Sequence, residues 1–198
     1  MKILAVQTGI FGENSNSTVL VKKVVDQLKA QHDVIEIITR DLTANPLPYF
    51  DAQVAMALNS EASSRTEEQQ EIVELSNALI AEIEAADIIV LGVPMYNFGI
   101  PAQMKSWFDL LARAGKTFKY TEQGPVGLLA DKPVYVAAAR GGVHLGKMSD
   151  SQTPFIKTIL GFLGLTDVRI VYAEGLNMGE SAKATSLSQF QADIAQIA

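Results

Sequence analysis

Two aromatic side chains and an asparagine lie between two prolines in the segment Pro94-Met95-Tyr96-Asn97-Phe98-Gly99-Ile100-Pro101. Residues 87–93 before it form an apolar run typical of a buried strand, and residues 101–113 after it have the pattern of a helix. The segment is therefore predicted to be a loop at the carboxyl end of a strand, where open α/β sheets bind ligands. The prolines stiffen this loop, and its side chains suit a flat ligand.

A second loop, residues 8–18, joins a predicted first strand to a predicted helix. The amides at the start of that helix, with the hydroxyls of Ser15, Ser17 and Thr18, predict an anion site that fits a phosphate monoester. An ordinary helix cap rich in serine and asparagine is the alternative. The glycine-lysine motif of ATP- and GTP-binding loops is absent, and so is the Gly-x-Gly-x-x-Gly fingerprint of dinucleotide sites.

A third loop, Ala139-Arg140-Gly141-Gly142-Val143-His144, follows another apolar run. Its paired glycines would let the backbone approach a flat ligand closely, and their amides could stabilise negative charge on the edge of that ligand. His144 could hydrogen-bond a ligand or a substrate, or it could be a solvated surface residue.

These motifs resemble those of the FMN-dependent NADH-azoreductases and NADH:quinone oxidoreductases, a flavodoxin-like family. The pattern Pro-Met-Tyr-Asn-Phe-x-Ile-Pro is followed by Gln-x-Lys and by an aromatic residue before Phe-Asp. Further similar segments are residues 14–17, 113–122, 140–144 and 162–167. The resemblance covers nearly the whole chain in order and in spacing.

The resemblance implies FMN as the cofactor and assigns residues to it. FMN-binding residues would be Gly9, Ser15, Asn16, Ser17, Met95, Tyr96, Asn97, Phe98, Ala139, Arg140, Gly141 and Gly142. His144 and Tyr120 would assist catalysis by delivering protons. Serine is frequent in the family where Gly9 and Ala139 stand, so one hydroxyl contact is expected to be missing at each.

The same resemblance implies a homodimer with its active site at the interface. Phe118, Tyr120, Phe162 and Tyr49 would build an apolar slot over the flavin, partly from the second subunit, and core packing is the alternative role for these side chains. NADH, with NADPH left open, would give two electrons to the flavin and leave. A quinone or an aromatic azo compound would then take them in the same slot, in a ping-pong mechanism.

Two other classes of function stay open at this point. A flavodoxin-like single-electron carrier would bind no nicotinamide, and it would gather acidic residues around an exposed flavin edge. Here the loops on the flavin side offer Arg140, His144 and Lys147 instead. An interaction module without flavin is the other class, and a colourless purified protein would favour it. No metal site is expected, because the spacing of metal ligands is missing.

The elements that must position these loops form a regular alternation. Strands are predicted over residues 2–7, 34–39, 87–93, 133–139 and 168–173, with helices between them. This predicts one flavodoxin-like α/β domain over residues 1–198, with a five-stranded parallel sheet of order 2-1-3-4-5 and helices on both faces. Thr66 and Gln69 have the spacing of a capping box. Residues 51–65 are expected to hold a short helix, and residues 116–129 a hairpin-like excursion.

The composition limits the partners. The 198 residues carry a formal net charge of -6 without a basic run, so nucleic acid and anionic membrane surfaces are not expected as partners. There is no cysteine, which excludes a thiol redox centre. The first residues form a strand rather than a signal peptide, and no apolar run reaches membrane-spanning length, so a cytoplasmic protein is expected.

Overall fold

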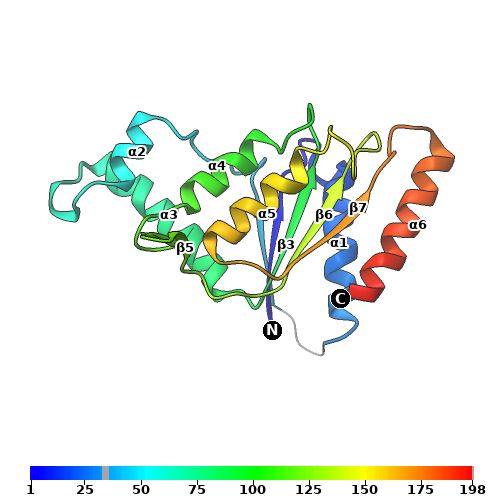
Figure 1. The fold of residues 1–198 in the computed structure, drawn as a ribbon, viewed down its shortest axis with the longest axis horizontal. Helices are drawn as coiled ribbons and strands as arrows, with labels where there is room; N and C mark the ends of the chain where they lie inside the picture. The colour runs from blue at the N-terminus through cyan, green and yellow to red at the C-terminus, as the bar shows by residue number, and fades with distance from the viewer. Residues whose placement is uncertain (33–35, 198) are drawn as a thin grey trace.

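The computed structural model describes residues 1–32 and 36–197. Its main sheet has five parallel strands, in the order β2-β1-β3-β6-β7 (Figure 1). The strands are β1 (Lys2–Gln7), β2 (Glu36–Asp41), β3 (Ile88–Pro94), β6 (Val134–Ala139) and β7 (Val168–Ala173). Since β4 and β5 belong to a separate hairpin, this is the predicted order 2-1-3-4-5. The second strand ends two residues later than expected, and residues 34 and 35 of that prediction lie outside the described residues.

Helices cover both faces of the sheet (Figure 1). Helices α1 (Asn16–Lys29) and α6 (Glu180–Ile197) pack on one face, and α3 (Glu67–Ala85), α4 (Ala102–Leu111) and α5 (Gln152–Leu163) pack on the other. In β1, Ile3 and Ala5 point to the face that α1 and α6 cover and pack in the core there. Leu4 and Val6 point to the opposite face and pack in the core beneath α3, α4 and α5. Burial on both faces explains why the strands are continuous apolar runs.

Local signals fix the ends of several helices. Thr66 and Gln69 form the predicted capping box at the start of α3. The short helix α2 (Ala52–Leu58) is capped by the Asp51 side chain, which accepts a hydrogen bond from the Val54 amide at 2.9 Å. Pro101 is the N-cap of α4 and not its first residue. No helix within the described ranges combines the length and the apolarity that crossing a membrane requires.

The expected excursion is a two-stranded hairpin of β4 (Phe118–Thr121) and β5 (Gly124–Gly127). It packs on α5, where the rings of Phe118 and Phe162 are 4.3 Å apart. It lies on the side of the molecule that holds α3, away from the loop that follows β3 (Figure 1). A side chain at Gly127 would come within 2.1 Å of the Gly164 amide, so this close packing requires glycine.

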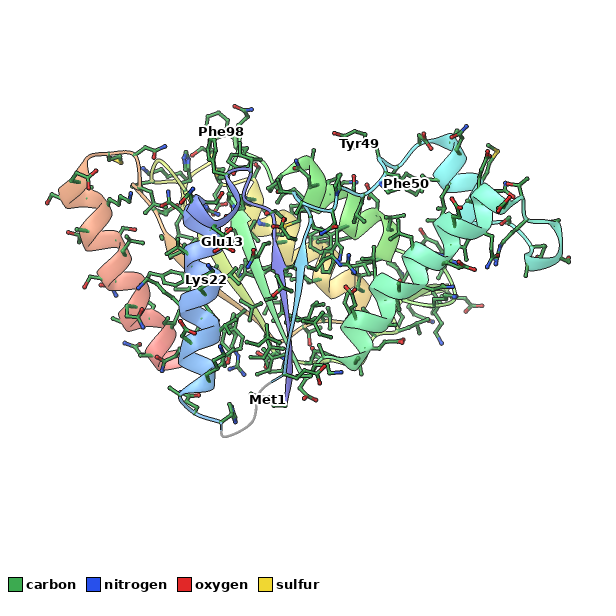
Figure 2. All side chains as sticks on the ribbon, turned by 180° about the vertical axis from the view of Figure 1, so that it is seen from behind. Met1, Glu13, Lys22, Tyr49, Phe50 and Phe98 are labelled. Carbon is green, nitrogen blue, oxygen red and sulfur yellow. The ribbon has the colours of Figure 1, made fainter. Side chains whose placement is uncertain are left out.

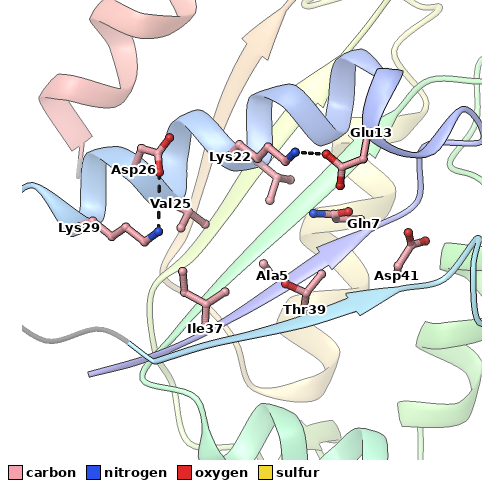
Figure 3. A pocket seen from close by; sticks show the side chains of 11 residues that line it. Ala5, Gln7, Glu13, Lys22, Val25, Asp26, Lys29, Ile37, Thr39 and Asp41 are labelled. Atoms are coloured by element: carbon pink, nitrogen blue, oxygen red, sulfur yellow. Dashed lines mark hydrogen bonds and ion pairs between the residues drawn. The ribbon is translucent and has the colours of Figure 1, made fainter.

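Strand β2 is one edge of the sheet, and a groove of about 430 Å³ runs between it and α1 (Figure 3). Its floor is formed by apolar side chains that include Ala5, Val25 and Ile37. The two lysines that line it pair with acids of the same groove, Lys22 with Glu13 and Lys29 with Asp26. None of the residues predicted to bind FMN lines this groove.

Candidate functional site

A cavity of about 220 Å³ opens at the carboxyl ends of β1, β3 and β6. This is the point at which the strand order reverses direction, where doubly wound sheets bind their ligands. The three predicted loops meet there, and the cavity is lined by Phe11, Asn14, Ser15, Asn16, Ser17, Pro94, Met95, Tyr96, Ala139, Arg140, Gly141, Leu176 and Asn177.

The start of α1 presents free amide donors at this cavity. Ser15 occupies the N-cap position, but its Oγ accepts a hydrogen bond from the Phe11 amide at 2.9 Å and does not cap the helix. As a result, the amides of Asn16, Ser17 and Thr18 have no acceptor within residues 1–32 and 36–197. Unpaired amides at a helix N-terminus are an anion-binding arrangement.

Two hydroxyls in the same turn lack hydrogen bonds. Ser17 Oγ and Thr18 Oγ1 are both buried, and neither has a partner among the described residues. A buried hydroxyl without a partner is costly, and of the two residues only Ser17 lines the cavity. The free amides and this hydroxyl together fit the terminal phosphate of FMN.

Gly9 shapes this loop without lining the cavity. A Cβ atom at Gly9 would lie 2.2 Å from Cβ of Ser15. Any larger residue at this position would displace the Ser15 side chain from its place beside the cavity. The departure from the family pattern at Gly9 is therefore matched to the position of Ser15.

A second cavity, of about 280 Å³, adjoins the first and shares Met95, Gly141 and Asn177 with it. It is lined in addition by Asn97, Phe98, Gly142 and His144. One side of it comes from the loop after β3 and the other from the loop after β6. The two cavities thus form one site with a phosphate end and a wider end.

The wider end is bounded by a tight turn. Tyr96 and Gly99 exchange amide–carbonyl hydrogen bonds of 3.1 and 3.0 Å, and the residues between them have φ angles of 48° for Asn97 and 68° for Phe98. Positive φ at both positions is the geometry of a type I′ turn, and it is strained for phenylalanine. The amides of Asn97 and Phe98 have no acceptor in the described part of the chain.

Paired glycines face this turn across the cavity. The carbonyls of Gly141 and Gly142 accept hydrogen bonds from the amides of Asn177 and Gly175, at 3.0 and 2.9 Å, but their own amides have no acceptor in the described ranges. A Cβ atom at Gly141 would come within 2.6 Å of Asn177 Nδ2. Free donors on both sides of a slot suit a flat heteroaromatic ring with acceptors on its edge, such as the ring of FMN.

Arg140 meets the cavity, but its guanidinium is committed elsewhere. The residue is 1% exposed, and its guanidinium pairs with Asp150 at 2.8 Å and with Glu174 at 2.9 Å. Its centre lies 4.9 Å from the centroid of the Tyr172 ring. Both neighbouring carboxylates therefore already neutralise the charge of Arg140, although the residue lines the cavity as predicted for an FMN-binding residue.

Hydrogen bonding also sets the ionisation of Asp150. Burial alone would raise the pKa of this carboxyl, but hydrogen bonds from Thr153 and Arg140, with the charge of Arg140, outweigh burial. The pKa of Asp150 consequently lies below its usual value. For Tyr172, burial dominates and raises the pKa of the phenol.

The two residues expected to assist catalysis lie far apart in this chain. His144 lines the wider cavity, with Nδ1 2.9 Å from Ser149 Oγ and its ring edge-on to Phe98 at 5.8 Å. Tyr120 is 75% exposed on the β4–β5 hairpin and lines neither cavity. The structure therefore brings together the predicted loops but not the predicted hairpin residue.

Sequence reasoning missed several residues of the site, of which Asn177 is the most informative. It contributes to both cavities and packs against Gly141. It belongs to the loop that follows β7, whose carboxyl end lies at the same edge of the sheet. Because this loop follows a strand at the same edge of the sheet, its position in the sequence could have predicted Asn177 as a site residue. Leu176 of the same loop was missed as well, whereas Phe11, Asn14 and Pro94 lie in the predicted loops but were not assigned to the ligand.

The sheet order and this divided cavity define a flavodoxin-like protein with a site for a phosphate and a flat ring. A family model described as the flavodoxin-like fold matches residues 1–198. The chain is 52% identical to the FMN-dependent NADH:quinone oxidoreductase of Alcanivorax borkumensis over 194 residues, or 98% of each chain. It is 51% identical to the protein of the same name from Cellvibrio japonicus over 182 residues, or 92% of each chain. It therefore belongs to the family of FMN-dependent NADH:quinone oxidoreductases.

A solved structure agrees with this membership. The crystal structure of the azoreductase from Bacillus anthracis str. Sterne matches 100% of this chain and 98% of its own, with a TM-score of 0.89 and 28% identity. Within residues 1–32 and 36–197, no three His, Asp or Glu side chains gather in a way that could hold a metal ion.

Proposed function

We propose that this protein is an FMN-dependent oxidoreductase that transfers two electrons from NADH to quinones and also cleaves azo compounds by reduction. The proposal rests on one observation: among the described residues the buried Ser17 hydroxyl and three amides of the helix start lack partners, at one end of a slot flanked by further amides without acceptors. The names of the relatives above give NADH as the electron donor and quinone as the acceptor. The name of the azoreductase neighbour gives the azo substrate class.

Bound FMN supplies the two-electron hydride chemistry, so the chain itself needs no nucleophile. The amides of Asn16 and Ser17 and the Ser17 hydroxyl would hold the phosphate. The amides of Phe98 and Gly142 would face the edge of the ring from opposite loops. Preorganised donors of this kind stabilise negative charge where it develops.

His144 is the candidate for moving a proton at the wider end. Ser149 engages Nδ1, whereas Nε2 lies beside Gly142, close enough that a Cβ there would come within 2.9 Å of it. Nε2 is thus the ring nitrogen left to pass a proton to a reduced quinone oxygen. Its neighbour Phe98, 59% exposed, would form an apolar wall for the substrate.

The alternative of a single-electron carrier is not favoured. The relatives at about half identity carry an enzyme's name that includes NADH as donor. The third loop places His144 and the half-exposed Val143 at the mouth of the site and no cluster of acids, because Asp150 and Glu174 are bound to Arg140.

A homodimer would complete the site. The β4–β5 hairpin, which carries the exposed Tyr120 and Val126, lies on the side of the chain away from α1 and α6 (Figure 1), and Tyr49 and Phe50 are exposed in the segment before α2. Figure 2 shows Tyr49 and Phe98 along the same edge of the molecule. Tyr120 and Phe162 would reach the wider cavity of the partner subunit, since they do not line the cavity of their own chain. A cytoplasmic location is part of the proposal, because NADH is supplied there.

The test has two parts, the identity of the bound cofactor and the form of the steady-state rate law. Cofactor released by heat from the purified protein should co-migrate with FMN, and NADH should bleach the visible spectrum without oxygen. With NADH and a quinone, double-reciprocal plots should give parallel lines, because both substrates must use one slot in turn. Recovery of FAD alone, or no flavin after reconstitution, would contradict the cofactor. Intersecting lines with a detectable ternary complex would contradict the single slot.

A further inference from the structure

Gln152, the first residue of α5, connects the two loops that flank the wider cavity. It is 2% exposed, and its side-chain amide makes three hydrogen bonds. Nε2 donates to the carbonyl of Pro94 at 2.9 Å and to that of Gly99 at 3.3 Å, which are the two ends of the loop after β3. Oε1 accepts from Arg140 Nε at 3.3 Å, in the loop after β6.

The same buried group reaches the other loops at this edge of the sheet. Arg140 contacts Glu174, and one oxygen of Glu174 also accepts from the amides of His144 and Leu145 at 2.9 Å. Beside Gln152, the Ser151 hydroxyl donates to the Phe98 carbonyl at 2.5 Å. Residues from three loops are thus held by side chains that do not line the wider cavity.

This arrangement explains how the strained turn persists. Asn97 and Phe98 both have positive φ, and such residues cost of order 1–3 kcal/mol unless their surroundings hold them. Gln152 bonds both ends of the turn-bearing loop, and Ser151 bonds its centre. Among the described residues the amides of Asn97 and Phe98 have no acceptor, so both stay available to a ligand while Gln152 and Ser151 hold the loop.

We propose that Gln152 is a positioning residue for flavin binding: it fixes the Asn97–Phe98 turn relative to Gly141 and Gly142, so that amides from both loops face one ring. The proposal rests on the proposed function. It adds that the affinity of the site and the reduction potential of its cofactor depend on a side chain that lines neither the phosphate end nor the wider end.

The experiment compares Gln152→Leu and Gln152→Glu with the parent. Leucine keeps the volume but removes the three hydrogen bonds, and glutamate keeps the bond to Arg140 but turns an oxygen toward two carbonyls. In both variants we expect the dissociation constant for FMN to rise about tenfold or more, as expected when a buried polar contact is lost. The midpoint potential of the bound cofactor should become more negative, because the donors that stabilise the reduced form are less well placed.

A second measurement needs no cofactor. Hydrogen exchange of the flavin-free protein should show the amides of Tyr96 and Gly99 exchanging about tenfold faster in Gln152→Leu, while the amides of the core of β3 keep the parent rate. Gln189→Leu is the matched control, since Gln189 is exposed on α6 and its side-chain amide donates to Asp193. If Gln152→Leu does not fold, Gln152→Asn is measured in the same way.

The outcomes separate this proposal from the one on which it rests. If the parent binds no FMN, the proposed function is wrong, and exchange at Tyr96 and Gly99 still decides whether Gln152 positions the turn. If parent and variants bind FMN equally, with equal potentials and equal exchange, Gln152 is not a positioning residue. A uniform loss of protection across β3 would also overturn the proposal, because it would indicate a general structural role.

Discussion

Ser17 and Thr18 are neighbours with buried hydroxyls that lack partners in the described structure, but only Ser17 lines the cavity. Removing either hydroxyl should therefore raise the stability of the flavin-free protein, by about 1 kcal/mol, because an unmet hydrogen-bonding group is deleted. Ser17→Ala should in addition weaken FMN binding by about tenfold, since a phosphate contact is lost.

The matched control for this prediction is Thr18→Val, which should stabilise the flavin-free protein and leave FMN affinity unchanged. Thermal unfolding without flavin and fluorescence titration with FMN measure the two effects. Equal FMN affinity in parent and Ser17→Ala would show that the phosphate does not use this hydroxyl.

At the residue level, the sequence predicted positions better than the directions of side chains. Ser15, Ser17, Met95 and Gly141 were placed at the site because strand ends of a parallel sheet share one edge, and they line the cavity. The commitment of the Arg140 guanidinium to Asp150 and Glu174 could not be predicted, because these acids lie 10 and 34 residues away along the chain. Whether these side chains bind FMN stays a prediction.

Among the elements, the loop that follows β6 depends on ionised Asp150. The pKa of this carboxyl is lowered in the folded protein, so the ionised form stabilises the fold above its unfolded pKa of about 3.9. That contribution is lost as the pH falls through the lower, folded pKa. Asp150→Asn should therefore reduce the free energy of unfolding at pH 7, and its further loss of stability on acidification should be smaller than that of the parent.

The free energy of unfolding, measured in urea at several pH values between about pH 7 and pH 2, tests this effect. Asp26→Asn is the control, because Asp26 is exposed on α1 and its ion pair with Lys29 is long, at 3.9 Å. The same pH dependence in Asp150→Asn and in the parent would mean that the pair with Arg140 does not contribute to stability.

Most elements could be predicted because their signals are local. The apolar runs identified all five sheet strands, and the Thr66–Gln69 spacing identified the start of α3. The turn at Asn97 and Phe98 was not predicted, since phenylalanine at positive φ contradicts its local preference. Tertiary contacts from Gln152 and Ser151 support that conformation, in addition to the hydrogen bonds between Tyr96 and Gly99.

For the whole molecule, the proposed dimer makes Tyr120 the decisive residue. It is 75% exposed on a hairpin remote from the cavities of its own chain. Tyr120→Glu should place a charge in the apolar interface and shift the protein toward a monomer, with a lower rate of quinone reduction but an unchanged fold. Light scattering with circular dichroism measures both.

Val19→Glu on α1 is the control, because Val19 is also partly exposed but lies on the opposite face of the sheet. It should leave the assembly and the activity as they are. A parent protein that is fully active as a monomer would contradict the dimer directly.

The open edge at β2 has a consequence for handling the protein. An unpaired strand edge is a template for a strand of another molecule and so for aggregation. Here the edge carries charged side chains held in ion pairs, Lys2 with Glu36 at 3.3 Å and Arg40 with Glu82. High salt weakens such pairs. Because the sequence pI is about 4.9, the net charge of the protein approaches zero near pH 5, where proteins associate most readily. Concentrated stocks should therefore stay clear longest at neutral pH and low ionic strength.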